Sequence, residues 1–115
     1  MNETNNTKYW ILFLQPLPET GERIAVALVF YDGINRIVEY DTTFSRILKL
    51  YPDLDINTLK FYLQSLQKDL ESSKDDIHVI INSYGPQISP SNTKKILHPI
   101  SKEIIRMLLK KHVNP

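Results

Sequence analysis

Residues 21–40 constrain the fold more than any other stretch of the chain. Two runs rich in β-branched and aromatic residues, 23–31 and 34–40, flank the dipeptide Asp32-Gly33. A two-residue Asp-Gly loop favours a type I′ turn, because both central residues of that turn need a positive φ. The stretch is therefore predicted to be a β-hairpin, and the rest of the chain must supply its neighbours.

A further strand is predicted before the hairpin, over residues 8–15. The order Lys-Tyr-Trp-Ile-Leu-Phe-Leu-Gln is almost continuously apolar, which is typical of a strand covered on both faces. Pro16 and Pro18 end this strand, because proline cannot donate a ladder hydrogen bond. Within the hairpin, the return strand 34–40 is the more polar of the two and is expected nearer an edge of the sheet.

Apolar residues recur at helical spacing in three segments, 44–51, 59–70 and 104–109, which are predicted to be helices. Asp55 and Ser101 precede the second and third of these segments as N-cap residues.

The region between the second and third helices is predicted to be mostly extended. Residues 77–82 favour a strand, because three consecutive β-branched residues lie within them. A continuation of the preceding helix is the alternative. Residues 84–92 have the glycine, proline and serine content of a loop, and residues 94–97 are predicted to be a short strand or extended segment.

Together these elements predict an α+β fold, in which a small, mainly antiparallel sheet is built on the hairpin and helices pack on one face. The chain of 115 residues is expected to form one domain, residues 1–115. Residues 1–6 are polar and are predicted to be a disordered tail. The N-terminus lacks a secretory pattern, and no apolar run reaches the roughly 18 residues of a membrane span. We expect a cytoplasmic protein.

The residue types that most enzyme and metal sites require are missing or scattered. The chain has no cysteine and three glycines, and its histidines, His78, His98 and His112, fall in separate segments. This composition excludes thiol nucleophiles and gives no metal-binding histidine spacing and no phosphate-binding glycine loop. The paired carboxylates lie at polar breaks or helix starts, where acidic residues are favoured. We therefore expect a non-enzymatic protein without a catalytic residue, a cofactor or a metal.

Basic side chains gather toward the C-terminus, although the net charge of the whole chain is only +1. In the last predicted helix, Lys102, Arg106 and Lys110 are spaced i, i+4, i+8 and share one face. Such a face can follow a phosphate backbone, and a solvated outer helix face explains the same spacing. The candidate nucleic-acid-binding residues are Lys94, Lys95, Lys102, Arg106, Lys110 and Lys111.

The first strand of the hairpin carries a family resemblance. Gly21-Glu22 and the small apolar residues that follow resemble the bacterial domain-of-unknown-function family 3037, whose hallmark is G-E-x-x-N-V-G-V-V-L-F. The matching residues are Gly21, Glu22, Val26, Leu28, Val29 and Phe30. The family's asparagine and second glycine fall on Ala25 and Ala27, so any polar role of that asparagine is lost here. Tyr84-Gly85-Pro86 falls where the family's Gly-Pro loop is expected.

The resemblance implies an accessory protein that works with a partner, because members of the family are small and often encoded beside HipA-like kinases. A HipA-like kinase or another component of a bacterial toxin, defence or regulatory system is the partner it implies.

Gly21 and Glu22 are candidates for a partner contact or a structural latch, together with Tyr84, Gly85 and Pro86. Gly21 can turn the chain at a positive φ, and Glu22 can accept hydrogen bonds at the start of the strand. The leading hypothesis is an accessory protein that binds a protein partner. Nucleic-acid binding by the basic C-terminal helix is the alternative, and an enzyme with a site at Glu22 beside Tyr84 or His98 is the third.

Overall fold

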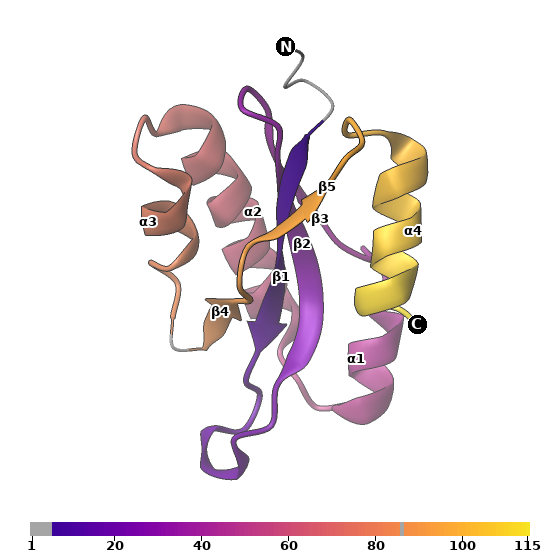
Figure 1. The fold of residues 1–115 in the computed structure, drawn as a ribbon. Coiled ribbons are helices and arrows are strands. Elements are labelled where there is room, and N and C mark those ends of the chain that lie inside the picture. The colour runs from indigo at the N-terminus through magenta and orange to yellow at the C-terminus, as the bar shows by residue number, and fades with distance from the viewer. Residues whose placement is uncertain (1–5, 86) are drawn as a thin grey trace.

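The computed structural model describes residues 6–85 and 87–115 and shows a sheet between two layers of helices (Figure 1). The strands are β1 (Thr7–Leu14), β2 (Ile24–Tyr31), β3 (Arg36–Glu39), β4 (Ile88–Pro90) and β5 (Lys94–Ile96). The helices are α1 (Ser45–Leu50), α2 (Ile56–Ser72), α3 (Ile77–Ile81) and α4 (Lys102–His112), with a 3-10 turn at Pro18–Thr20. Asn6 is the one residue of the expected N-terminal tail that lies within the described residues.

The sheet is antiparallel and is centred on β1. β2 pairs with one side of β1, and β4 and β5 pair in turn with its other side, while β3 forms the far edge beyond β2. The predicted α+β class with a mainly antiparallel sheet is confirmed. β5 lies within the segment predicted to be extended, whereas β4 forms inside the stretch predicted to be a loop.

The hairpin at Asp32-Gly33 is present, but its loop is longer than predicted. Tyr31 pairs with Arg36, so residues 32–35 form the loop. The Asp32 carboxylate accepts hydrogen bonds from the backbone N–H groups of Ile34 and Asn35, at 2.9 and 2.6 Å. These bonds form an Asx-turn, which accounts for a loop longer than the predicted two residues.

A bulge in β2 decides which side chains reach which face of the sheet. The register against β1 shifts between Leu12 and Phe13, which makes Val26 the extra residue on β2. Simple alternation would place Val26 and Leu28 on the same face. Because of the bulge, Val26 instead packs in the core beneath α2, and Leu28 packs in a second core beneath α4.

The second core explains the position of α4. Successive side chains of β1 point to opposite faces of the sheet, and both faces are apolar. Trp10 and Leu12 lie toward α2, whereas Tyr9 and Ile11 lie toward α4. The prediction that helices pack on one face holds for α2 and α3, whereas α4 covers the other face with Leu108 (Figure 1). None of the helices in the described part of the chain is long and apolar enough to cross a bilayer.

Residues 77–81 form the helix α3, so the predicted strand at 77–82 is wrong. The Asp76 side chain accepts a hydrogen bond from the His78 N–H at 2.8 Å and caps the helix. The spacing of Ile77, Ile80 and Ile81 then buries all three side chains on one side. The alternative of a continued helix is wrong as well, because α2 ends at Ser72.

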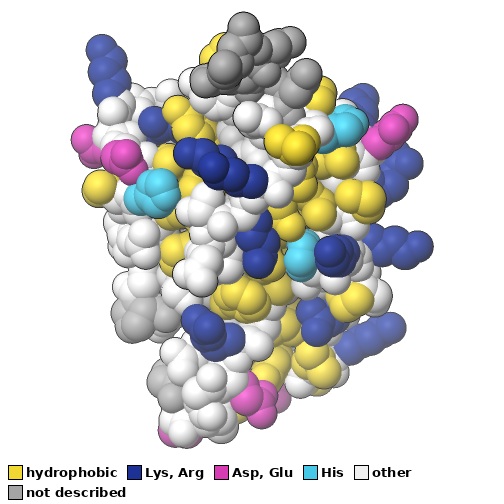
Figure 2. Space-filling view, viewed as in Figure 1, with side chains coloured by type: hydrophobic (Ala, Val, Ile, Leu, Met, Phe, Trp, Pro, Cys, Tyr) yellow, Lys and Arg dark blue, Asp and Glu magenta, His cyan; other side chains and the backbone are white. Residues whose placement is uncertain are grey.

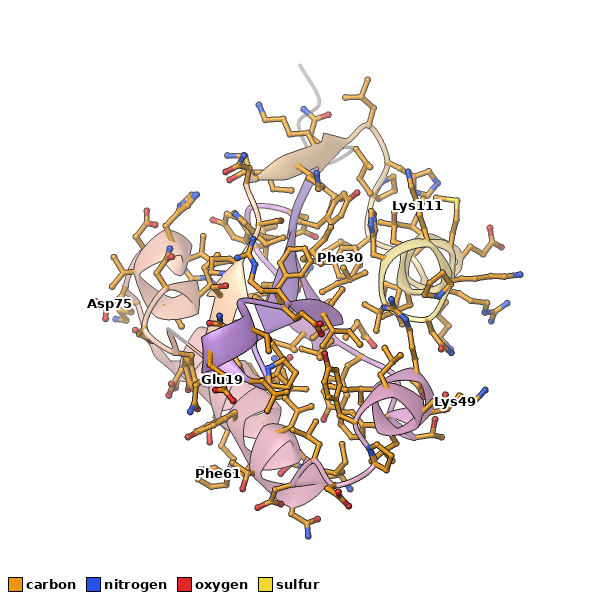
Figure 3. The ribbon with its side chains drawn as sticks, turned by 90° about the horizontal axis from the view of Figure 1, so that it is seen from below. Glu19, Phe30, Lys49, Phe61, Asp75 and Lys111 are labelled. Atoms are coloured by element: carbon orange, nitrogen blue, oxygen red, sulfur yellow. The ribbon has the colours of Figure 1, made fainter. Side chains whose placement is uncertain are left out.

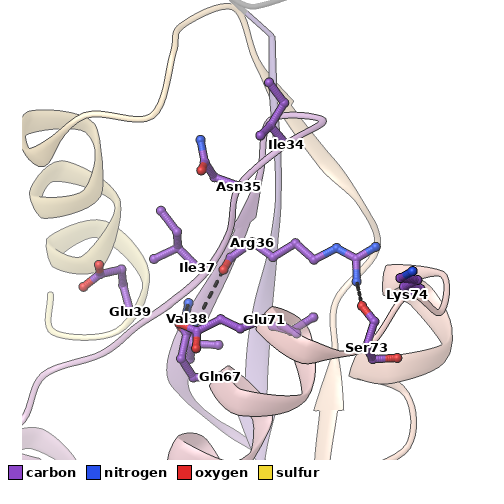
Figure 4. A pocket seen from close by; sticks show the side chains of 11 residues that line it. Ile34, Asn35, Arg36, Ile37, Val38, Glu39, Gln67, Glu71, Ser73 and Lys74 are labelled. Carbon is purple, nitrogen blue, oxygen red and sulfur yellow. Dashed lines mark hydrogen bonds between the residues drawn. The ribbon is translucent and has the colours of Figure 1, made fainter.

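The β3 edge of the sheet is closed by one side chain. The Val38 N–H donates to Gln67 Oε1 at 2.7 Å, and Gln67 Nε2 donates to the Arg36 carbonyl at 3.3 Å (Figure 4). A neighbouring strand would use these same backbone groups. The edge position predicted for this strand is confirmed, and the Gln67 carboxamide occupies two of the hydrogen-bonding positions there.

Replacing Gln67 tests this closure. Gln67→Ala removes the partners of the Val38 N–H and the Arg36 carbonyl, so we expect the free energy of unfolding to fall by about 1 kcal/mol. Hydrogen exchange of the Val38 amide should accelerate. Urea unfolding and exchange measured by NMR check both effects. Gln64→Ala, at an exposed position of the same helix, is the matched control; an equal loss in both variants would contradict the role of Gln67 at the edge.

Candidate binding surfaces

Glu22, two residues before β2 begins, bonds a tyrosine from a distant loop. The Tyr51 hydroxyl donates to Glu22 Oε2 at 2.5 Å and so joins the β1–β2 connection to the α1–α2 connection. Gly21, immediately before it, takes a φ of 71°, the positive value for which glycine is suited. The hydrogen bond to the carboxylate raises the pKa of Tyr51, because it stabilises the protonated phenol.

The same two connections enclose an apolar groove of about 390 Å³, which we call the latch groove. Its lining residues are Pro16, Leu17, Leu50, Tyr51, Pro52, Asp53, Leu54 and Asp55. Leu17 and Leu50 are 43% and 57% exposed. Figure 3 views this end of the molecule, with Glu19 on the β1–β2 connection and Lys49 on α1. Residues far apart in sequence thus form one concave apolar site.

Tyr84, another candidate residue, takes part in a separate contact. Its hydroxyl donates to Asp69 Oδ2 of α2 at 2.5 Å, and its ring meets the edge of the Tyr62 ring at a centroid distance of 6.4 Å. Burial, together with the Asp69 carboxylate, raises the pKa of Tyr84 to about 12. Gly85 follows in the turn, and Pro86 lies outside the described residues.

The hypothesis of an enzyme site at Glu22 requires Tyr84 or His98 beside it, and the contacts do not bring these residues together. Glu22 bonds Tyr51, whereas the His98 carbonyl accepts a hydrogen bond from Thr7 at the other end of β1. Across residues 6–85 and 87–115, no group of three histidine, aspartate or glutamate residues is placed to hold a metal ion.

The predicted basic residues divide between two surfaces. Lys102, Arg106 and Lys110 share one side of α4, as their spacing predicted, but this side faces carboxylates. They line a groove of about 720 Å³ together with Glu39 and Asp41. Burial raises the pKa of Glu39. The groove therefore has mixed charge, which weakens its field for a polyanion.

Lys94, Lys95 and Lys111 lie around the β5 edge instead. Lys94 pairs with Tyr9 of β1, whose hydroxyl is 3.2 Å from His112 Nε2 on α4. Lys111 projects from the side of α4 that faces this edge (Figure 3). Burial lowers the pKa of His112, and the positive charges of Lys111 and Lys94 lower it further.

Lys95 also has a neighbour that sequence analysis did not single out. Lys8 lies directly opposite it in the β1–β5 register, and both side chains are exposed. Like charges in this position destabilise a sheet. Within the described ranges the one ion pair under 4 Å joins His78 to Asp76, so neither lysine is paired with a carboxylate. Knowledge of the strand register would identify Lys8 as the neighbour of Lys95. The sequence does not give that register, because it depends on contacts between distant segments.

Neither a family model, nor a curated protein, nor a solved structure matches the chain. The assignment to family 3037 stays a prediction from the sequence.

The link between Glu22 and Tyr51 is testable by titration. Glu22→Gln removes the negative charge that holds the proton on Tyr51, so the pKa of Tyr51 should fall toward its ordinary value of 10.0. NMR or ultraviolet titration of the tyrosines measures this change. The pKa of Tyr84, held at about 12 by burial and Asp69, is the internal control and should not move. An unchanged pKa of Tyr51 would contradict the bond.

His112 makes stability depend on pH in a defined direction. The pKa of His112 in the folded protein is below its ordinary value of 6.5. As the pH falls through 6.5, the unfolded chain therefore binds more protons at this residue than the folded protein does. The contribution of His112 is thus complete above pH 6.5 and is lost as the pH falls toward the folded pKa. The melting temperature of wild type should rise relative to that of His112→Gln as the pH increases from about 5 to about 7.5. A difference independent of pH would refute this coupling.

Proposed function

We propose that the chain is a cytoplasmic accessory protein that binds a protein partner at the latch groove. The observation that carries the proposal is the exposure of Leu17 and Leu50 within one concave site, at 43% and 57%. Apolar side chains gathered in an exposed concavity are typical of surfaces that another protein covers. The bond between Glu22 and Tyr51 fixes the two connections that present these leucines, which limits the entropy lost on binding.

The chemistry of the groove indicates which partner segment it fits. The apolar floor suits a leucine, isoleucine or phenylalanine side chain, and Tyr51 offers an aromatic anchor of the kind enriched in interfaces. Asp53 and Asp55 lie on the lining of the same groove. Lysine or arginine beside the apolar anchor of the partner would complement these carboxylates.

The resemblance to family 3037 supports a specific first candidate. A HipA-like kinase, or another component of a bacterial toxin, defence or regulatory system, is the partner that the resemblance implies. This choice depends on the resemblance, whereas the position of the binding site depends on the groove alone.

An affinity pull-down from the native host tests the proposal. Wild-type protein should recover one stoichiometric partner, detected by mass spectrometry, after nuclease treatment. The double variant Leu17→Asp with Leu50→Asp should lose that partner, because two carboxylates in an apolar interface remain unpaired. Binding of the purified partner, measured by calorimetry, should weaken by at least about a hundredfold.

The matched control is Leu97→Asp, which makes the same change at a leucine that is 86% exposed and lies outside the groove. This variant should retain the partner. Retention of the partner by the double groove variant, or equal loss in the control, would overturn the proposal.

A further inference from the structure

We propose that the edge of the sheet at β5 binds the phosphate backbone of nucleic acid. This is a function beyond the partner binding proposed above, and it uses other residues. The surface, which we call the β5 basic surface, consists of Lys8, Arg23, Lys94, Lys95 and Lys111. It replaces the helix face at residues 102–110 as the candidate nucleic-acid site.

The strand register concentrates positive charge on one face of this edge. Lys8 on β1 and Lys95 on β5 are directly opposed, with both side chains exposed. Two opposed lysines repel each other in the free protein, and an anion between them would convert this repulsion into attraction. A shallow cavity of about 300 Å³ adjoins the pair, lined also by Thr7 and Tyr31. Asp32 lines it too, with its carboxylate bonded to its own loop.

The other face of the same edge adds further cations. Lys94 projects toward α4, where it is close enough to His112 to lower the pKa of that histidine, as Lys111 also does. His112 Nε2 itself lies 3.2 Å from the hydroxyl of Tyr9, the residue of β1 that pairs with Lys94. Lys94 and Lys111 thus add two charges beside Lys95.

Arg23 extends the surface along β4. Its guanidinium lies 5.0 Å from the centre of the Phe13 ring and donates to Ser89 Oγ at 3.2 Å. These contacts hold the guanidinium in place, so that little further conformational entropy is lost when it meets a phosphate. The stacked arginine and the lysines of β5 therefore follow one edge of the sheet, from β4 to β5.

The distribution of charge favours a polyanion over a neutral partner. Figure 2 looks onto this edge and shows Lys and Arg side chains over β5 and along α4, while Asp and Glu side chains lie toward the margins of the view. In the portion of the chain that the structure describes, none of these five cations lies within 4 Å of a carboxylate. The net charge of the whole protein is only +1, so attraction of a polyanion would come from this local concentration of positive charge.

Fluorescence anisotropy with a labelled oligothymidylate of about 20 nucleotides tests the proposal. If the surface engages about four phosphates, the logarithm of the association constant should fall with the logarithm of the salt concentration at a slope of about −3. The double variant Lys94→Gln with Lys95→Gln should bind about tenfold more weakly and reduce the steepness of that slope by about 1.4. Thermal melts confirm that the variant is folded.

The control variant, Lys102→Gln with Arg106→Gln, removes the same number of positive charges from the other surface of α4 and should bind as wild type does. Equal losses in both variants would show that net charge alone drives binding and would overturn the proposal. Undetectable binding by wild type, or equally tight binding of a polyglutamate of the same charge, would overturn it as well.

Discussion

The double-sided burial of β1 is the constraint on which the rest of the structure depends. Its alternating side chains are apolar on both faces, so each face needs its own cover. α2 and α3 cover one face, and α4 returns from the far end of the chain to cover the other. Because of the bulge at Val26, Ile24 and Val26 pack in the core beneath α2 while Leu28 and Phe30 pack beneath α4, whereas straight alternation would place all four on one face.

Local chemistry made parts of this fold predictable from sequence. The hairpin at Asp32-Gly33 and the helices that follow Asp55 and Ser101 are set by turn and cap residues within a few positions of one another. The region 77–81 shows the limit of such reasoning. Its β-branched residues favour a strand, but the Asp76 cap and the burial of one helical face against the α2 core outweigh that preference.

The remaining features depend on pairs of residues that only the folded chain brings together. Nothing near Gln67 in the sequence indicates that its carboxamide meets β3, and nothing near Lys8 indicates that it faces Lys95. Glu22 was recognisable as a candidate, but its partner Tyr51 was not. Both candidate surfaces are therefore products of strand register and loop placement, and the basic helix face that the spacing favoured meets carboxylates instead.

Closure of the β3 edge by a single carboxamide has a consequence for the ageing of the protein. Glutamine is one of few side chains that can donate to one backbone group while accepting from another, as Gln67 does. Deamidation would turn it into a glutamate, which still accepts from Val38 but has nothing to donate to the Arg36 carbonyl. A slow chemical modification of one side chain would then leave the Arg36 carbonyl at the sheet edge without this donor, and a neighbouring strand could bond that carbonyl instead.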